Sequence, residues 1–136
     1  MPDCLSYNQK SSHELNGRQQ AYRTGLRVEK LALIWLLLTG FRIIATRYKT
    51  PGGEIDIIAR RGRTLVVLEV KYRKQLDEAL YSVTARNRHR IVSATRFLLA
   101  SRQDLANLNI RFDVMVFARW RWPQYIKAAF DSTDSF

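Results

Sequence analysis

The sequence contains few of the residues that bind soft metals. Its 136 residues include a single cysteine, Cys4, and two histidines, His13 and His89. An internal disulfide and a cysteine-based zinc site are therefore excluded, and a histidine metal cluster is not expected. Any metal that this chain binds should be held by oxygen ligands.

Acidic residues are also scarce. Twelve Asp and Glu residues stand against 23 Lys and Arg residues, which gives a formal net charge of +11. A surface of this sign steers association with phosphate backbones and supplies non-specific affinity for nucleic acid through counterion release. Composition alone does not separate DNA from RNA, or either of them from an anionic membrane.

Long apolar runs are absent. The first twenty residues contain no apolar core of the length that a secretory signal needs. The strongest apolar run, residues 31–38, is much shorter than the ~20 residues of a membrane span. We therefore expect a cytoplasmic protein without a membrane partner, and the chain length fits one compact domain.

The pattern of the chain suggests three parts. Residues 1–20 are rich in Ser, Asn and Gln, and we expect a flexible polar extension that joins the first helix near its end. Residues 21–118 hold the apolar periodicities of a folded domain. Residues 119–136 form a tail that could add an edge strand or a flap, and the pattern does not choose between them.

Within the folded part, helical and strand patterns alternate. Thr39-Gly40 ends the first helix, Pro51-Gly52-Gly53 forms a turn, and Thr84 is suited to cap the second helix. The order helix, three strands, helix, strand predicts an α/β fold, a mixed β-sheet flanked by helices. The expected elements are a helix at 21–38, strands at 41–48, 54–60 and 64–73, a helix at 85–100 and a strand at 110–117.

The second and third strands are expected to form a hairpin with a two-residue turn at Gly62-Arg63. This register places Asp56 opposite Glu69 and Glu54 opposite Lys71. Residues two apart in a strand point the same way, so all four side chains would share one face. A turn at residues 61–62 would instead place Glu54 opposite Glu69, and either register gathers the same groups.

Carboxylates this close repel each other, so the hairpin needs a compensating charge. Solvent is a poor candidate because the flanking residues are apolar and indicate strands that are covered on both faces. A hard cation such as Mg²⁺ or Mn²⁺ fits, since it takes oxygen ligands together with water and substrate phosphate. Lys71 could then orient or deprotonate a water, or stabilise charge on phosphorus. The simpler alternative is a surface hairpin with exposed ion pairs.

The segment GGEIDIIARRGRTLVVLEVKYR, residues 52–73, resembles the characteristic block of the YraN-like bacterial family. This family is an endonuclease-like group that is related to Holliday-junction resolvases. The resemblance covers residues 21–118 and implies a restriction-endonuclease-like core of the PD-(D/E)XK type. Further segments that look like family elements are residues 28–32, 41–44, 90–98 and 111–114.

The resemblance also implies roles for individual residues. The PD position falls on Asp56 and the (D/E)XK triplet on residues 69–71, so Asp56 and Glu69 would be metal ligands and Val70 would add its backbone carbonyl. The sequence departs from the pattern at Ile55, where the motif usually has proline, and at Asn87, where the family commonly has lysine. The resemblance favours DNA over RNA, structured or branched DNA in particular, and a homodimer.

Two further acidic residues have alternative roles. Glu29 lies on an apolar stripe of the first helix and should point toward the core. It is either a third acidic group near the metal, as in related resolvases, or a boundary residue that pairs with an arginine. Asp113, beside Phe112 in the last strand, is expected to pair with an arginine at the edge of the core, and a catalytic role is the less favoured alternative.

Basic and aromatic residues could contact nucleic acid. Trp120, Trp122 and Tyr125 could stack on unpaired bases, although packing is the ordinary role of such residues. Each basic residue could equally belong to a solvated charged face. The candidates for nucleic-acid binding are Arg60, Arg61, Arg63, Arg73, Lys74, Arg86, Arg88 and Arg90.

Together these patterns predict a Mg²⁺- or Mn²⁺-dependent endonuclease that hydrolyses phosphodiester bonds. Asp56 and Glu69 would hold the metal with support from Glu54 and Glu29, and Lys71 would assist. One alternative is a non-catalytic nucleic-acid-binding protein that retains the nuclease fold. Another is an interaction module whose basic face binds an acidic protein.

Overall fold

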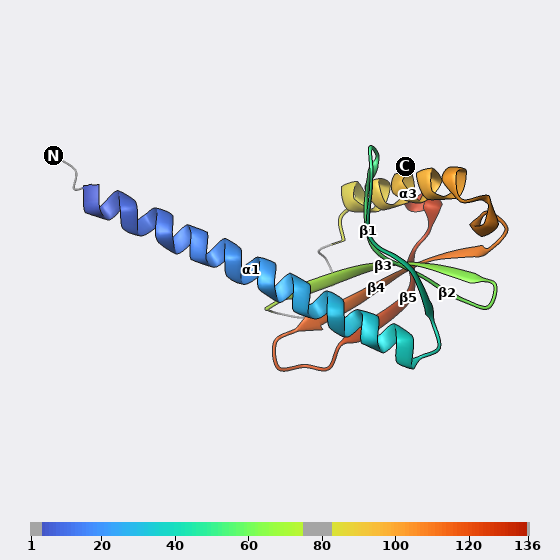
Figure 1. The fold of residues 1–136 in the computed structure, drawn as a ribbon, viewed down its shortest axis with the longest axis horizontal. Coiled ribbons are helices and arrows are strands. Elements are labelled where there is room, and N and C mark those ends of the chain that lie inside the picture. Colours follow the sequence, from blue (N-terminus) through green and yellow to red (C-terminus); the bar gives the residue numbers. More distant parts are fainter. Residues whose placement is uncertain (1–3, 75–82, 136) are drawn as a thin grey trace.

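A computed structural model describes residues 4–74 and 83–135 as a five-stranded sheet between two helices (Figure 1). The strands follow chain order across the sheet, and all neighbours are antiparallel except β3 and β4. The predicted α/β fold with a mixed sheet is therefore confirmed. The elements are α1 (Cys4–Leu38), β1 (Arg42–Thr50), β2 (Gly53–Arg61), β3 (Thr64–Arg73), α3 (Ala85–Ser101), β4 (Asn109–Ala118) and β5 (Gln124–Phe130), with short 3₁₀ turns at Gln103–Leu105 and Ser132–Ser135.

Helix α1 begins at Cys4, so the expected start near residue 21 is wrong. Its N-terminal half extends beyond the sheet, whereas its C-terminal half packs on the sheet through Val28, Ala32 and Leu36 (Figure 1). The predicted stop is confirmed, because Gly40 has a φ of 87° and the chain turns there into β1. No helix in the described ranges is long and apolar enough to cross a membrane.

The two helices cover opposite faces of the sheet and create two apolar layers. On one side, residues of α3 such as Ile91 pack with Leu65 and Val67. On the other side, α1 packs with Val66, Leu68 and their neighbours. Successive residues of β3 thus enter alternate layers, and the prediction that the hairpin is covered on both faces is confirmed.

The register of the β2–β3 hairpin agrees with the prediction over its first half. Gly62 has a φ of 61°, and the pairing runs from Arg61 with Thr64 to Ile57 with Leu68. The ladder ends there. The expected pairs of Asp56 with Glu69 and of Glu54 with Lys71 are therefore wrong as ladder pairs, although these four side chains still meet, as described below.

The tail forms an edge strand, which resolves the alternative left open by the sequence. Strand β5 pairs with β4, and two of its residues donate hydrogen bonds to Asp113 of β4, which is fully buried. Arg111 donates to both carboxylate oxygens of Asp113, the Tyr125 hydroxyl donates to Oδ2, and the Ala128 N–H donates to Oδ1. The prediction that Asp113 pairs with an arginine is confirmed.

The turn between β1 and β2 lies against α3, and two glycines make this contact possible. A Cβ atom on Gly53 would collide with the backbone carbonyl of Arg90, and one on Gly52 would collide with the side chain of Ser93. The side chain of Thr50 closes the turn by accepting hydrogen bonds from both glycine N–H groups. The close approach fixes α3 next to the start of β2.

We expect Gly53→Ala to lower the free energy of unfolding by about 1–3 kcal/mol, because a backbone carbonyl cannot move aside as a flexible side chain can. Urea unfolding followed by circular dichroism measures the change. Gly17→Ala is the matched control, since its Cβ meets nothing within 4 Å and it should stabilise helix α1 by about 0.5–1 kcal/mol. Equal effects of the two substitutions would contradict the steric explanation.

Candidate active site

Strand β2 has an irregularity at Asp56. Ile55 packs in the layer of α3, whereas Ile57 packs in the layer of α1, so the alternation of faces breaks between them. On the neighbouring strand Arg47 has a φ of 49°, and the paired residues of β1 and β2 pass over Arg47 and Asp56. Asp56 is thereby freed from the regular ladder on both sides.

The carboxylate of Asp56 turns toward β3, where the ladder has ended. Its Oδ2 accepts a hydrogen bond of 2.9 Å from the N–H of Val70. A side chain thus satisfies the backbone donor at the point where the two strands separate. This bond explains the failure of the predicted pair, because the side chain of Asp56 occupies the place where ladder pairing would continue.

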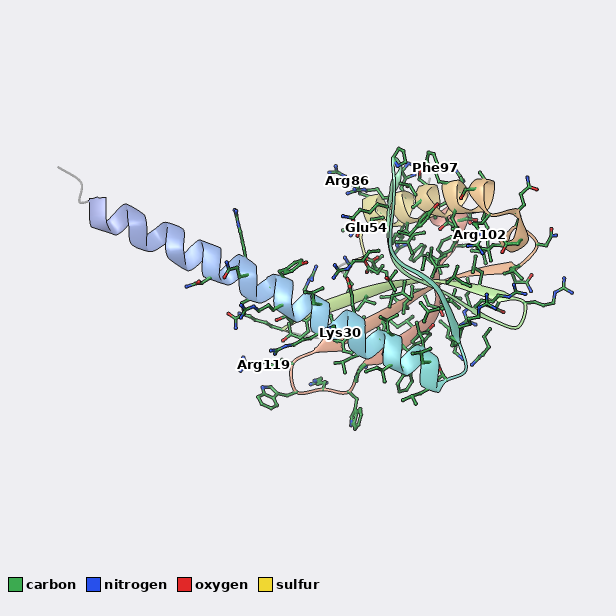
Figure 2. All side chains as sticks on the ribbon, viewed as in Figure 1. Lys30, Glu54, Arg86, Phe97, Arg102 and Arg119 are labelled. Carbon is green, nitrogen blue, oxygen red and sulfur yellow. The ribbon has the colours of Figure 1, made fainter. Side chains whose placement is uncertain are left out.

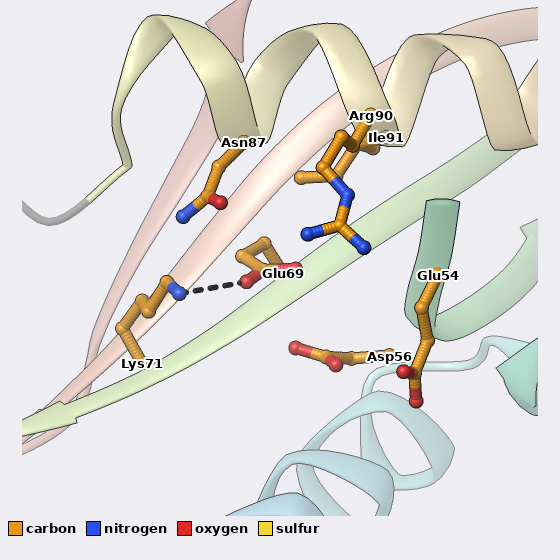
Figure 3. A pocket seen from close by; sticks show the side chains of 7 residues that line it. All are labelled: Glu54, Asp56, Glu69, Lys71, Asn87, Arg90 and Ile91. Carbon is orange, nitrogen blue, oxygen red and sulfur yellow. Dashed lines mark ion pairs between the residues drawn. The ribbon is translucent and has the colours of Figure 1, made fainter. Parts of the chain in front are cut away.

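Strand β3 keeps its alternation and supplies two further groups. Glu69 and Lys71 form an ion pair, with 3.0 Å between Oε1 and Nζ, and their side chains are only 11% and 16% exposed. They share a hollow of about 210 Å³ with Asp56 and Glu54 (Figure 3). The four residues that the sequence placed together are therefore brought together around one cavity.

Helix α3 forms the other wall of this hollow. Thr84 caps the helix by accepting a hydrogen bond of 3.2 Å from the N–H of Asn87, as predicted. Asn87, Arg90 and Ile91 then face the cavity, and the guanidinium of Arg90 points toward the carboxylates (Figure 3). A cation and an amide thus stand opposite the acidic residues, where a bound phosphate would need donors.

The environment of Asp56 disfavours its charged form. Burial, followed by the charge of Glu69, raises the pKa of Asp56 to about 8, although the Val70 N–H opposes the shift. The charge of Glu29 adds a smaller contribution in the same direction. The Asp56 carboxyl therefore keeps its proton near neutral pH unless positive charge enters the hollow.

Glu29 reaches this region from α1 but is paired. Its Oε2 accepts a hydrogen bond of 3.0 Å from Nε of Arg47, and its side chain is 25% exposed. The alternative in which Glu29 pairs with an arginine is confirmed. Glu29 nevertheless lines a hollow on the α1 side together with Asp56.

Arg47 was not a candidate from the sequence, although a signal was present. A two-residue turn at Pro51-Gly52 pairs Thr50 with Gly53, and continuing that register brings Arg47 opposite Asp56. The structure places Arg47, Glu29 and Asp56 around one hollow, so the register of the first hairpin is the signal that identifies this arginine.

The described residues contain no group of three or more His, Cys, Asp or Glu side chains arranged to hold a metal ion. A cation in this hollow would thus be held by the carboxylate pair Asp56 and Glu69, with other ligands from the backbone, water or substrate. Magnesium sites are commonly built this way. The donor set fits a hard divalent cation, while supporting roles for Glu54 and Glu29 and a carbonyl ligand at Val70 stay predictions.

The predicted basic residues separate into two groups. Arg60, Arg61 and Arg63 lie at the tip of the β2–β3 hairpin, roughly 15 Å along the strand from Asp56. Arg61 is engaged there, since it donates to the Thr39 carbonyl at 3.0 Å and lies 4.5 Å from the ring centre of Phe41. The structure does not bring this first group to the cavity.

The second group lies nearer. Arg73 and Lys74 line a larger hollow of about 950 Å³ on the α1 side, which also reaches Asp56 and Glu69. On α3, Arg90 faces the smaller hollow, Arg86 is exposed, and the Arg88 guanidinium lies 5.7 Å from the ring centre of Phe130. The carboxylate pair is thus approached from both faces of the sheet, with cations on each side.

Comparisons with known proteins find close relatives. Residues 28–117 match the family model described as "Uncharacterised protein family UPF0102". A UPF0102 protein of Bartonella tribocorum is 46% identical over 115 residues, which cover 85% of this chain and 88% of the relative. A UPF0102 protein of Bradyrhizobium diazoefficiens is 44% identical over 116 residues, covering 85% and 87%. One from Bartonella henselae is 46% identical over 115 residues, covering 85% and 91%.

Proposed function

The chain belongs to the uncharacterised protein family UPF0102, and we propose that it is a metal-dependent endonuclease of the PD-(D/E)XK type that hydrolyses nucleic-acid phosphodiester bonds. One observation carries this proposal. Two carboxylates, Asp56 and Glu69, converge with Lys71 in a hollow where burial and then the charge of Glu69 raise the pKa of Asp56. The charged form of Asp56 is therefore disfavoured in the protein alone, whereas a cation would favour it.

Each residue of the hollow has a role in this proposal. Asp56 and Glu69 hold Mg²⁺ or Mn²⁺, which when bound supplies Lewis acidity toward the phosphate and the attacking water. Lys71, whose Nζ lies 3.0 Å from Glu69, would orient the attacking water or stabilise charge on phosphorus. Arg90 and Asn87 are placed to bind phosphate oxygens.

The substrate class rests on the charge and on the resemblance to the YraN-like group. A net charge of +11 supports a polyanionic substrate. The resemblance to Holliday-junction resolvases supports DNA, structured or branched DNA in particular, and a homodimer. Basic residues lie on both sides of the carboxylate pair, with Arg73 and Lys74 on one side and Arg90 on the other. This arrangement agrees with a nucleic-acid strand that passes across the pair.

The test is cleavage of labelled duplex, branched and single-stranded DNA, and of RNA, with Mg²⁺, with Mn²⁺ or with EDTA. We expect cleavage that requires the metal and that falls at least ~100-fold in Asp56→Ala and Lys71→Ala, because each removes a group from the reacting centre. Asp104→Ala and Lys127→Ala are matched controls, since both residues are exposed and distant from the hollow. The controls should cleave like the unmodified protein.

Two results would overturn the proposal. Cleavage that persists equally in both site variants would come from another site or from a contaminant. Absence of cleavage on every substrate, together with no metal binding by calorimetry, would leave the hollow without a catalytic role.

The alternative is a non-catalytic nucleic-acid-binding protein that retains this fold. It is favoured by the ion pair of Lys71 with Glu69 and by the hydrogen bond that Asp56 accepts from Val70, because both groups have partners without a metal. Salt-dependent DNA binding that is the same with and without metal, and the same in Asp56→Ala, would support this alternative.

A further inference from the structure

The loop between β4 and β5 carries two tryptophans that packing does not explain. Trp120 is 90% exposed and Trp122 is 89% exposed. Ordinary packing, which the sequence suggested for this region, is wrong for both of them and correct for Tyr125, whose hydroxyl donates to buried Asp113. Large aromatic side chains this open to water on a loop are typical of a binding surface.

The backbone conformation of the loop also indicates a binding surface. Trp120 has a φ of 63°, a region that bulky residues seldom adopt and that glycine or asparagine adopts at little cost. The fold of the loop therefore gains nothing from a tryptophan at this position. An aromatic residue that is both strained and exposed requires another explanation, which contact with a ligand would provide.

The loop lies beside the larger hollow that leads to the carboxylates. Strands β3 and β4 are parallel and pair Arg73 with Ala118, so the loop starts next to the end of β3, below the middle of α1 (Figure 1). Arg119, which Figure 2 labels, is the first residue of the loop. It lines that hollow with Arg73 and Lys74. Asp56 and Glu69 line the same hollow.

Arginine and tryptophan alternate through the four residues 119–122. Indole rings stack on unpaired bases, while guanidinium groups bind the phosphates between them. The guanidinium of Arg119 lies 5.7 Å from the ring centre of Trp120, so a phosphate contact and a base contact are available side by side. Duplex DNA offers these rings no exposed base faces, because its bases are stacked on each other.

We propose that residues 119–122, the tryptophan loop, bind unpaired bases of the substrate and hold its single-stranded part in the hollow that leads to Asp56 and Glu69. The substrate class is then a nucleic acid with a single-stranded segment beside the cleaved phosphate. The reference to cleavage rests on the proposed function, whereas the binding itself does not.

The spacing sets the position of the unpaired segment. Arg73 lies two positions after Lys71 in β3, and the loop follows Ala118, the partner of Arg73 on the neighbouring strand. Strand geometry places Ala118, the last residue before the loop, roughly 8 Å from Lys71. The unpaired bases should therefore lie within a few nucleotides of the cleaved bond.

Binding is tested without metal, in EDTA, by fluorescence anisotropy of a labelled single strand of about 20 nucleotides and of the matching duplex. We expect the double variant Trp120→Ala/Trp122→Ala to bind the single strand at least about tenfold more weakly and the duplex within about twofold of normal. The slope of affinity against salt should not change, because no positive charge is removed. Trp35→Ala on α1 is the matched control, since Trp35 is also an exposed tryptophan.

The variants should fold, since the removed rings contact little. We expect Trp120→Gly to keep or raise the Tm while it weakens single-strand binding, because glycine relieves the backbone strain. Equal losses for single strand and duplex, or no loss for either, would overturn the inference. So would tryptophan-dependent binding to anionic phosphatidylserine vesicles with unchanged binding of the single strand, because the loop would then be a membrane contact.

The outcomes separate this inference from the proposed function. If no substrate is cleaved but the tryptophan loop is required for single-strand binding in EDTA, the nuclease proposal fails and the loop assignment stands. If cleavage depends on Asp56 and Lys71 but the double tryptophan variant binds and cleaves normally, the nuclease proposal stands and the loop assignment fails.

Discussion

Asp56→Asn is expected to make the metal-free protein more stable at pH 8, by about 2–5 kcal/mol, while it abolishes metal binding. The carboxylate is mostly buried, and burial together with the charge of Glu69 raises its pKa to about 8. An asparagine oxygen can still accept the hydrogen bond from the Val70 N–H, so the local backbone keeps its partner. The substitution removes the unfavourable charge and keeps the shape of the side chain.

The sign of the pH dependence follows from the direction of the shift. Between pH 4 and pH 8 the folded protein keeps a proton on Asp56 that the unfolded chain has lost, because the unfolded pKa is 3.8. The contribution of Asp56 to the free energy of unfolding is fully present below pH 4 and is lost as pH rises through about 8. Asp56→Asn should remove this decline in the free energy of unfolding. The difference in stability between Asp56→Asn and the unmodified protein should therefore grow from pH 5 to pH 8.

Urea unfolding in EDTA at several pH values between 5 and 8.5 measures this effect. Asp104→Asn is the control, because Asp104 is exposed and its pKa is lowered by Arg102, so it contributes no slope in this range. Added Mg²⁺ should stabilise the unmodified protein and leave Asp56→Asn unchanged. An Asp56→Asn protein that is less stable than the original at pH 8 would show that the carboxylate serves the fold and not a ligand.

Much of the fold could be predicted because its signals are local. Gly40 ends α1, Thr84 caps α3 and Gly62 sets the hairpin register, each through a conformation or a hydrogen bond of neighbouring residues. The start of α1 was missed for the opposite reason. Residues 4–20 lack an apolar stripe, so their periodicity carries no helical signal although the helix runs through them.

The candidate site was predicted in its members but not in its geometry. The register brought Asp56, Glu69 and Lys71 together, yet it assumed an unbroken ladder. The break at Asp56 depends on a side chain that replaces a ladder partner of Val70, and on Arg47 with its positive φ. Such a break arises from tertiary contacts, which alternation of apolar and polar residues does not encode.

The two hollows share Asp56 and Glu69, and this arrangement follows from the break in the strand. A residue in a regular strand faces one side of its sheet, whereas Asp56 lies where the side chains change face. It can therefore be reached from the side of α3 and from the side of α1. Hydrolysis at Asp56 and Glu69 and binding at the tryptophan loop would then act on one nucleic-acid strand. That strand would pass the end of the sheet where β2 and β3 separate.

Asp113→Ala is expected to lower the free energy of unfolding by about 3–5 kcal/mol and to release β5 from the sheet. The substitution leaves Arg111, the Tyr125 hydroxyl and the Ala128 N–H without their shared partner. Ala128 has a φ of 48°, so part of the hydrogen bond to Asp113 offsets backbone strain in β5. Hydrogen exchange should show lost protection across β5, and the tryptophan loop at its start should lose its position.

Asp104→Ala gives a control with the same arginine pairing but without the burial and the two additional donors of Asp113. Arg102 and Asp104 are two residues apart and form two hydrogen bonds of 2.8 Å, like the pair of Arg111 and Asp113, but the Asp104 side chain is 58% exposed. Its removal should lower the free energy of unfolding far less than removal of Asp113, because solvent screens an exposed ion pair. If both substitutions had equal effects, the anchoring of β5 would reside in the apolar contacts of Phe130 with Phe112. A larger loss at Asp113 would instead assign it to one buried carboxylate that joins three donors, and single-strand binding should then weaken in step with the lost protection of β5.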